Sequence, residues 1–254
     1  MAEFFEGFFS TPQLTRWMDA MPRRFSCREF ASPADLAQFS ALSYTAARLS
    51  KKGIRMELFQ QGANDLVVPL PLFPRFSGLM QYMVIYADKD LQQAELKAGI
   101  CGEAFQLELV TQGLQGCWMT GNYRKLTAVE QMKDNEKVMA VMPFGVPKDK
   151  DGASRSKRKI LTAFSNDDPT LWPYWAYRAA EAIRSAPSAL NRQPWKMSFS
   201  GSTLSFAGNK HDSIDTGIAI THLLCAMADQ EYSLRLASDN KTYLISVKDN
   251  HEPV

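Results

Sequence analysis

The sequence lacks the features that mark several classes of protein. No apolar run approaches the ~20 residues of a transmembrane helix, and the opening MAEFFEGFFS is acidic where a signal peptide is basic. The four cysteines are widely spaced without a CxxC pair, and the three histidines show no metal-ligand spacing with them. There is no G-x-G-x-x-G, so no separate dinucleotide-binding domain is implied. We therefore expect a reduced, cytoplasmic protein without a membrane span or a metal.

Charge of one sign is also lacking. The 29 basic and 27 acidic residues leave a net charge of +2, which gives no general reason to expect nucleic acid or membrane as a partner. One stretch, residues 148–159, is basic and could be a localisation signal or a nucleic-acid patch. It carries no aromatic residue in an almost neutral protein, so we expect no nucleic acid there.

The length and the apolar content allow a large core. At 254 residues with 45% hydrophobic residues, the chain can hold one large domain or two packed halves. The spacing of apolar residues predicts an α+β protein with helices over 11–21, 32–49, 96–112, 167–183 and 212–228. It predicts strands over 54–60, 81–86, 137–143, 196–200, 203–207, 232–236 and 242–248. Gly113 is expected to cap the third helix, and Phe144–Pro147 to break a strand.

Two short stretches carry polar groups in an arrangement suited to ligand binding. Arg24, Ser26 and Arg28 bring hydrogen-bond donors together, which favours phosphate, although a solvated basic turn has the same composition. Residues 185–195, SAPSALNRQPW, join a predicted helix to a predicted strand. Their small residues leave the backbone open to close approach, and Trp195 can anchor the loop. A well-built surface turn explains this composition equally well.

Both stretches resemble motifs of the nitroreductase family of flavoproteins. The loop is similar to S-x-S-x-N-x-Q-P-W, and Arg24-x-Ser26-x-Arg28-x-Phe30 is similar to R-x-S-x-[KR]-x-F. The resemblance implies an FMN cofactor, with Arg24 and Ser26 at its phosphate and ribityl end and Arg28 at the pyrimidine edge. It also implies that four loop residues lie along the flavin: Pro187, Ser188, Ala189 and Asn191.

Two fainter similarities complete the implied site. Residues 113–121 resemble the segment whose backbone N–H groups point at flavin N5 and O4, a role carried here to Met119, Thr120 and Gly121. A glycine-rich turn pinned by Trp118 is the structural alternative, and a nucleophilic Cys117 would need a histidine partner that the nearby sequence does not offer. The basic residues Lys157 and Arg158 resemble the element that closes over the flavin phosphate.

The order of the motifs differs from that of the family. There the loop follows the arginine motif by about two dozen residues, whereas here one lies near residue 24 and the other near 190. We therefore expect a fused pseudo-dimer with the nitroreductase-like fold, in which residues 1–160 and 161–254 are two similar halves that complete one flavin site within a monomer.

The resemblance also implies an activity. NAD(P)H would reduce the flavin, which would then reduce a small-molecule acceptor such as a quinone or a nitroaromatic with ping-pong kinetics. No side chain needs to act as a general acid or base, so no catalytic residue is predicted. Two alternatives remain: a flavin-binding protein without turnover, and an interaction protein without a cofactor. Asn64 and Cys117 have no assigned role, and His222 is expected to be a core histidine.

Overall fold

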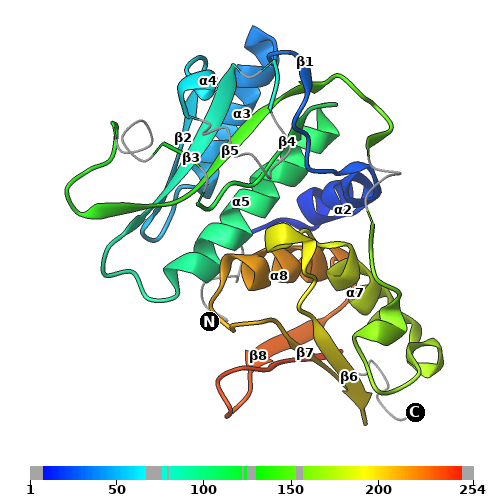
Figure 1. The fold of residues 1–254 in the computed structure, drawn as a ribbon. Coiled ribbons are helices and arrows are strands. Elements are labelled where there is room, and N and C mark those ends of the chain that lie inside the picture. The colour runs from blue at the N-terminus through cyan, green and yellow to red at the C-terminus, as the bar shows by residue number, and fades with distance from the viewer. Residues whose placement is uncertain are drawn as a thin grey trace. The chain divides into compact units, whose positions relative to one another are not determined.

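The chain forms two compact units. In this computed structural model the described residues are 8–66, 76–78, 80–121, 123–124, 130–152 and 157–247. Residues 22–156 form one unit, here called the central unit, while residues 1–21 and 157–254 form the other, the terminal unit (Figure 1). The two similar halves expected at 1–160 and 161–254 are inferred from the order of the motifs, and they stay a prediction.

The central unit is built on an antiparallel sheet. Its strand order is β1 (Phe30–Ser32), β5 (Glu136–Pro147), β3 (Gln81–Asp88) and β2 (Ile54–Phe59), with β4 (Gln115–Gly116) also paired to β5. Every pairing is antiparallel. Strand β3 therefore lies in the interior of the sheet, and seven of its eight residues are buried, as its unbroken apolar sequence requires.

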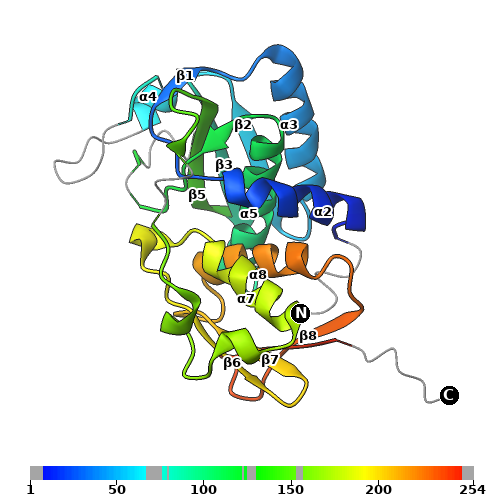
Figure 2. The ribbon, with the colours of Figure 1, turned by 90° about the vertical axis from the view of Figure 1, so that its right-hand side faces the viewer.

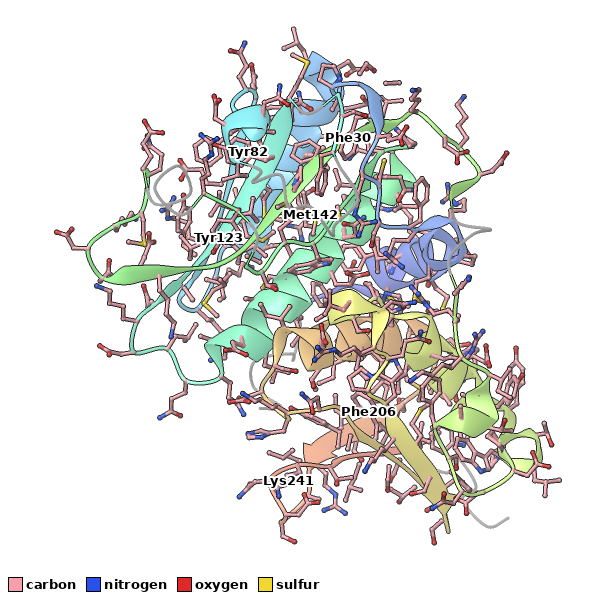
Figure 3. The ribbon with its side chains drawn as sticks, in the orientation of Figure 1. Phe30, Tyr82, Tyr123, Met142, Phe206 and Lys241 are labelled. Carbon is pink, nitrogen blue, oxygen red and sulfur yellow. The ribbon has the colours of Figure 1, made fainter. Side chains whose placement is uncertain are left out.

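Helices cover the two faces of this sheet. Helices α3 (Leu36–Leu49) and α5 (Ala94–Thr111) pack on one face and the short α4 (Ala63–Leu66) lies on the other (Figure 2). Side chains of β3 alternate between the faces. Tyr82 and Val84, with Phe30, join the cluster that contains α4, whereas Ile85 reaches the α5 side (Figure 3).

Local sequence signals set the ends of α3 and α5. Asp35 caps α3, because its carboxylate accepts a hydrogen bond from the Gln38 N–H at 2.8 Å. Helix α5 ends as predicted at Gly113, which has a φ of +76°. The Leu114 N–H bonds to the Leu109 carbonyl at 2.9 Å and that of Gly113 to the Val110 carbonyl at 3.1 Å, the pair of bonds that defines a Schellman motif.

The prediction that Phe144–Pro147 would end a strand is wrong. Strand β5 continues to Pro147, and β1 pairs with this last part of it. Gly145 is there because the two backbones approach closely: a Cβ at this position would lie 2.9 Å from the Ser32 carbonyl oxygen. The glycine therefore marks a close approach of two paired strands rather than a turn.

The terminal unit has its own antiparallel sheet. The strand order is β6 (Lys196–Ser200), β7 (Thr203–Ala207), β9 (Tyr243–Val247) and β8 (Tyr232–Leu236). The predicted β6–β7 hairpin turns at Gly201, whose φ is +58°. Helices α7 (Tyr174–Ser185) and α8 (Ile214–Ala226) pack against each other, and the N-terminal α2 (Thr11–Ala20) packs on α8.

One predicted helix start shifts in the terminal unit, whereas α2 begins at Thr11 as predicted. Ser10 is the N-cap of α2, and its N–H donates to Gln13 Oε1 at 3.1 Å. The helix expected to begin near Asp168 begins at Tyr174. A separate 3₁₀ turn forms at 169–171, and Pro173 then takes the position just before α7.

The predicted α+β class is confirmed. Each unit packs helices on an antiparallel sheet. Within the described residues, no helix combines the length and apolar character needed to cross a bilayer.

Candidate functional site

The arginine motif lies beside the segment predicted to face flavin N5. Ser26 forms a parallel bridge with Gly116, and the Cys27 N–H donates to the Gly116 carbonyl at 3.1 Å. The two segments are about 90 residues apart in the chain, and the central unit brings them together as neighbouring extended strands. This juxtaposition is the first element of the candidate site.

The side chain of Gln115 fixes the backbone on both sides of Arg24. Its Oε1 accepts from the Phe25 N–H at 3.1 Å, and its Nε2 donates to the Arg23 carbonyl at 2.9 Å. Gln115 is buried, so the two bonds satisfy an amide that would otherwise be costly in the interior. The turn that carries Arg24 is therefore held from β4.

Arg24 itself points inward. It is 4% exposed, and its Nε lies 3.9 Å from Glu103 Oε1, an ion pair without a hydrogen bond. Within the described residues, Nε has no hydrogen-bond partner. Burial lowers the pKa of Arg24, and the charges of Glu103 and Cys117 oppose that shift. Ser26 is exposed and Arg28 half-buried, so the three motif residues present donors at different depths.

The segment 117–121 runs from the sheet into the open. The Met119 N–H donates to the Val141 carbonyl, and the Val141 N–H returns a bond to Met119, both at 2.9 Å. Thr120 and Gly121 follow and are exposed, and a Cβ on Gly121 would meet no atom within 4 Å. The backbone N–H of Met119 is thus already bonded within the sheet. A ligand at this segment would therefore approach the backbone at Thr120 and Gly121.

Cys117 does not have the setting of a reactive thiol. It is buried, and burial raises its pKa despite the nearby charges of Arg28 and Arg24. All four cysteines, which lie within the described residues, are buried, and none forms a disulfide. His222 is also fully buried, as expected of a core histidine, and its Nδ1 lies 2.9 Å from Ser185 Oγ in the terminal unit.

In the terminal unit, the predicted loop leaves α7 and turns sharply. Ala186 and Pro187 are buried, and the exposed turn at 189–191 follows. Leu190, Asn191 and Gln193 have φ values of +52°, +53° and +50°. Left-handed backbone costs an L-residue other than glycine about 1–2 kcal/mol. Three such residues within four positions mean that tertiary contacts impose this shape, a feature that is common at functional sites.

Those contacts come mainly from the basic residues 157–159. Arg158 Nη1 donates to Asn191 Oδ1 at 2.8 Å, and Asn191 Nδ2 donates to the Lys157 carbonyl at 3.0 Å. The Lys159 N–H donates to Gln193 Oε1 at 2.9 Å. The amide of Asn191 therefore joins the loop to the basic segment, so two of the motifs expected at the flavin lie together in one unit.

A second anchor comes from α8. The Ala189 N–H donates to the Asp215 carboxylate, at 3.0 Å and 3.2 Å from its two oxygens. Burial raises the pKa of Asp215. Trp195 is buried at the other end of the loop, with its ring centroid 5.9 Å from that of Phe206. The predicted role of Trp195 as an anchor is confirmed.

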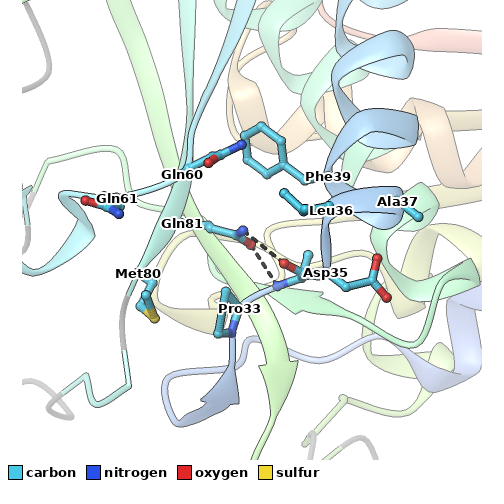
Figure 4. Close-up of a pocket in the computed structure, with 10 residues that line it drawn as sticks. Pro33, Asp35, Leu36, Ala37, Phe39, Gln60, Gln61, Met80 and Gln81 are labelled. Atoms are coloured by element: carbon cyan, nitrogen blue, oxygen red, sulfur yellow. Dashed lines mark hydrogen bonds between the residues drawn. The ribbon is translucent and has the colours of Figure 1, made fainter.

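A separate cavity of about 640 Å³ opens in the central unit and contains none of the predicted site residues (Figure 4). Its lining includes Asp35 and Leu36 at the start of α3, Gln60 after β2 and Met80 before β3. Gln81 also lines it, and both of its amide atoms are already bonded to the backbone of Ala34.

The structure thus gathers the predicted residues in two sets. The central unit brings together Arg24, Ser26, Arg28, Met119, Thr120 and Gly121. The terminal unit brings together Lys157, Arg158, Pro187, Ser188, Ala189 and Asn191. Asn64 is exposed on α4. Within the described residues there is no cluster of metal-ligating side chains.

Sequence reasoning missed Glu103 and Gln115. Each carries a polar group into the interior to meet the arginine motif. A signal was present for Glu103, because a carboxylate that follows the apolar run 98–102 of a buried helix needs a partner. The partner is Arg24, 79 residues earlier in the chain, and only the tertiary fold brings the two together.

Comparison with known proteins agrees with the fold. The model of the family described as "Putative TM nitroreductase" matches residues 16–227. Among solved structures, a Thermotoga maritima protein described as a nitroreductase of that kind has a TM-score of 0.65 at 22% identity, covering 91% of this chain and 93% of its own. The comparison with curated proteins found no match.

Two further structures are less similar. A nitroreductase family protein from Streptococcus pneumoniae has a TM-score of 0.47 at 12% identity, covering 60% of this chain and 100% of its own. The NADPH:FMN oxidoreductase of Vibrio harveyi, solved with NAD⁺, has a TM-score of 0.40 at 15% identity, covering 53% of this chain and 70% of its own.

Proposed function

Because the chain belongs to the TM nitroreductase family, whose model matches residues 16–227, we propose that it is an FMN-dependent oxidoreductase. In this proposal NAD(P)H is the reductant, and a nitroaromatic, quinone or similar small molecule is the acceptor. The observation that carries it is the pairing of the arginine motif with Gln115 and Gly116 in the central unit. Two motifs with separate resemblances to flavin-binding segments are neighbours there.

The residues present fit a planar, anionic group such as FMN. Within the described residues, Arg24 has a buried Nε without a hydrogen-bond partner, and Ser26, two residues further on, is exposed. Two guanidinium groups and a hydroxyl suit a phosphate or an electron-rich ring edge. The open backbone at Thr120 and Gly121 suits the close approach of a flat ring.

Each residue has a distinct task in this proposal. Arg24 and Ser26 would hold the phosphate and ribityl end, and Arg28 would place positive charge at the pyrimidine edge. The N–H groups of Thr120 and Gly121 orient the ring. When bound, FMN supplies the two-electron redox chemistry. The protein places both substrates and excludes side reactions, and no side chain is asked to transfer a proton.

We also propose that the terminal-unit set binds the same FMN. This part of the proposal rests on the resemblance of the loop and of the basic segment to family motifs. Lys157 and Arg158 supply charge for the phosphate, and Pro187, Ser188, Ala189 and Asn191 border the flavin. One chain then binds one FMN and works as a monomer.

Arginine variants test the cofactor assignment. Arg24→Ala should weaken FMN binding by about ten- to hundredfold, because a charge-assisted hydrogen bond contributes about 1.5–3 kcal/mol. Removing Arg24 takes the positive charge away from the buried Glu103 carboxylate, so Arg28→Ala, at a half-buried position, provides a second test with less risk to folding. The exposed neighbour Arg23 provides the matched control, Arg23→Ala. Equal FMN affinity in all four proteins would contradict the assignment.

Kinetics test the reaction. With NAD(P)H and a quinone as substrates, double-reciprocal plots at several acceptor concentrations should be parallel, because both substrates use one site in turn. Intersecting lines would rule out this scheme. A yellow protein that consumes no NAD(P)H with any quinone or nitroaromatic acceptor would instead be a flavin-binding protein without turnover.

A further inference from the structure

A buried carboxylate connects the two flavin-facing segments of the central unit. Glu103, on α5, is completely buried. Its Oε1 lies 3.9 Å from Arg24 Nε, and its Oε2 accepts a hydrogen bond from Trp118 Nε1 at 2.9 Å. Arg24 belongs to the arginine motif, and Trp118 stands one residue before Met119. One side chain therefore contacts both motifs from beneath.

The indole of Trp118 is held closely against α5. An ideal Cβ on Gly102 would lie 2.2 Å from its Cη2 and 2.8 Å from its Cζ2. Only a glycine leaves room for the ring at that position. The ring therefore has little freedom to move while its Nε1 remains bonded to Glu103, and residues 119–121 follow directly from it.

The charge of Glu103 acts on Arg24 in the interior, where little water can solvate the guanidinium. An arginine that is 4% exposed needs a countercharge or hydrogen-bond acceptors. At 3.9 Å the carboxylate supplies charge without taking up a hydrogen bond from Nε. The guanidinium is thus held in place electrostatically, and within the described residues its buried Nε has no hydrogen-bond partner.

We propose that Glu103 is a positioning residue that orients Arg24 for the anionic end of the cofactor and couples it to the segment that begins at Trp118. The identity of the ligand in this inference rests on the proposed function, whereas the coupling of Arg24 to Trp118 through Glu103 does not. Displacing the carboxylate of Glu103 disturbs both motifs at once. A change at Arg24 reaches Trp118 because both side chains contact this one carboxylate.

Two substitutions separate the two contacts. Glu103→Gln keeps an oxygen to accept from Trp118 but removes the charge beside Arg24. Trp118→Phe keeps the charge and removes the hydrogen bond. Glu108→Gln provides a matched control on the same helix, because five residues along α5 turn the side chain by about 140° from the Glu103 direction.

FMN affinity, measured by quenching of flavin fluorescence, gives the first readout. Glu103→Gln should weaken binding about tenfold in the parent and by less than about twofold in an Arg24→Gln background, because there it has no arginine to position. Glu108→Gln should change affinity by less than about twofold. A loss of the same size in both backgrounds, or an equal loss in Glu108→Gln, would overturn the inference. Arg24→Met, which also removes the positive charge, is the substitute background if Arg24→Gln does not fold.

A second readout needs no cofactor. In the apoprotein, the indole N–H resonance of Trp118, assigned by its absence in Trp118→Phe, should shift in Glu103→Gln and in Arg24→Gln but not in Glu108→Gln. If the parent does not bind FMN, the proposed function fails while this coupling can still be seen. An indole resonance that stays in place in both variants overturns the inference whether or not FMN binds.

Discussion

Replacing Gly102 with alanine tests how Trp118 is held on α5. Two opposed effects act at this position. Alanine is favoured over glycine by about 1 kcal/mol inside a helix. The new methyl group, however, would lie 2.2 Å from Trp118 Cη2 and 2.6 Å from Ile85 Cδ1, far inside contact distance. The end of Ile85 can rotate away, whereas the indole ring can move only as a whole.

The expected magnitude follows from these contacts. Overpacking a core costs about 1–3 kcal/mol. Moving the ring also breaks the hydrogen bond from its Nε1 to Glu103, and hydrogen bonds to charged groups contribute about 1.5–3 kcal/mol. After about 1 kcal/mol of helix propensity is returned, Gly102→Ala should lower the free energy of unfolding by about 1.5–5 kcal/mol.

Urea unfolding of four proteins measures this effect: the parent, Gly102→Ala, Trp118→Phe and the double variant. Phenylalanine lacks the outer ring atoms that meet the new methyl group, so Gly102→Ala should be close to neutral, or stabilising by up to about 1 kcal/mol, in the Trp118→Phe background. A stabilised Gly102→Ala single variant would refute the argument. So would an equal cost in both backgrounds.

Three further outcomes follow from other contacts. Gln106 is fully buried and, within the described residues, neither of its amide atoms has a partner, so Gln106→Met should raise the thermal midpoint; a fall would contradict this. The hydrogen bond from Arg55 lowers the pKa of Glu136 below the ordinary value for a glutamate, 4.5. The contribution of this ion pair to the stability of the folded state is therefore present above pH 4.5 and is lost as the pH falls through the lower folded-state pKa. Glu136→Gln should therefore be less stable than the parent at pH 7 and nearly equal to it in acid, whereas a pH-independent difference would refute the assignment. Asn191→Ala removes one of the hydrogen bonds that hold Arg158, together with the bond to the Lys157 carbonyl, so trypsin should cut after Arg158 faster than in the parent. An unchanged rate would show that Asn191 does not hold this segment.

Elements with local signals could be predicted from the sequence. The end of α5 at Gly113 needed only a glycine after an apolar run, and the β6–β7 hairpin needed only Gly201 between alternating strands. The start of α7 could not be placed in this way. The Asp168-Pro169 signal does begin a turn, but Pro173 interrupts it before the helix.

Long-range pairing explains what the sequence did not reveal. Gly145 has the composition of a strand breaker, and only the crossing of β1 beside it makes a glycine necessary within β5. The motif resemblance identified Arg24 but not Glu103 or Gln115, whose roles depend on which segment lies beside the arginine. The use of the Asn191 amide to hold residues 157–158 was likewise invisible, because it requires two loops to meet.

The central claim is that one chain binds one FMN through the residues of both motif sets. Native mass spectrometry of the apoprotein titrated with FMN measures this directly. The account predicts a monomer that saturates at one FMN per chain, with weaker binding in Arg28→Ala. No bound FMN, or saturation at two FMN per chain, would contradict it.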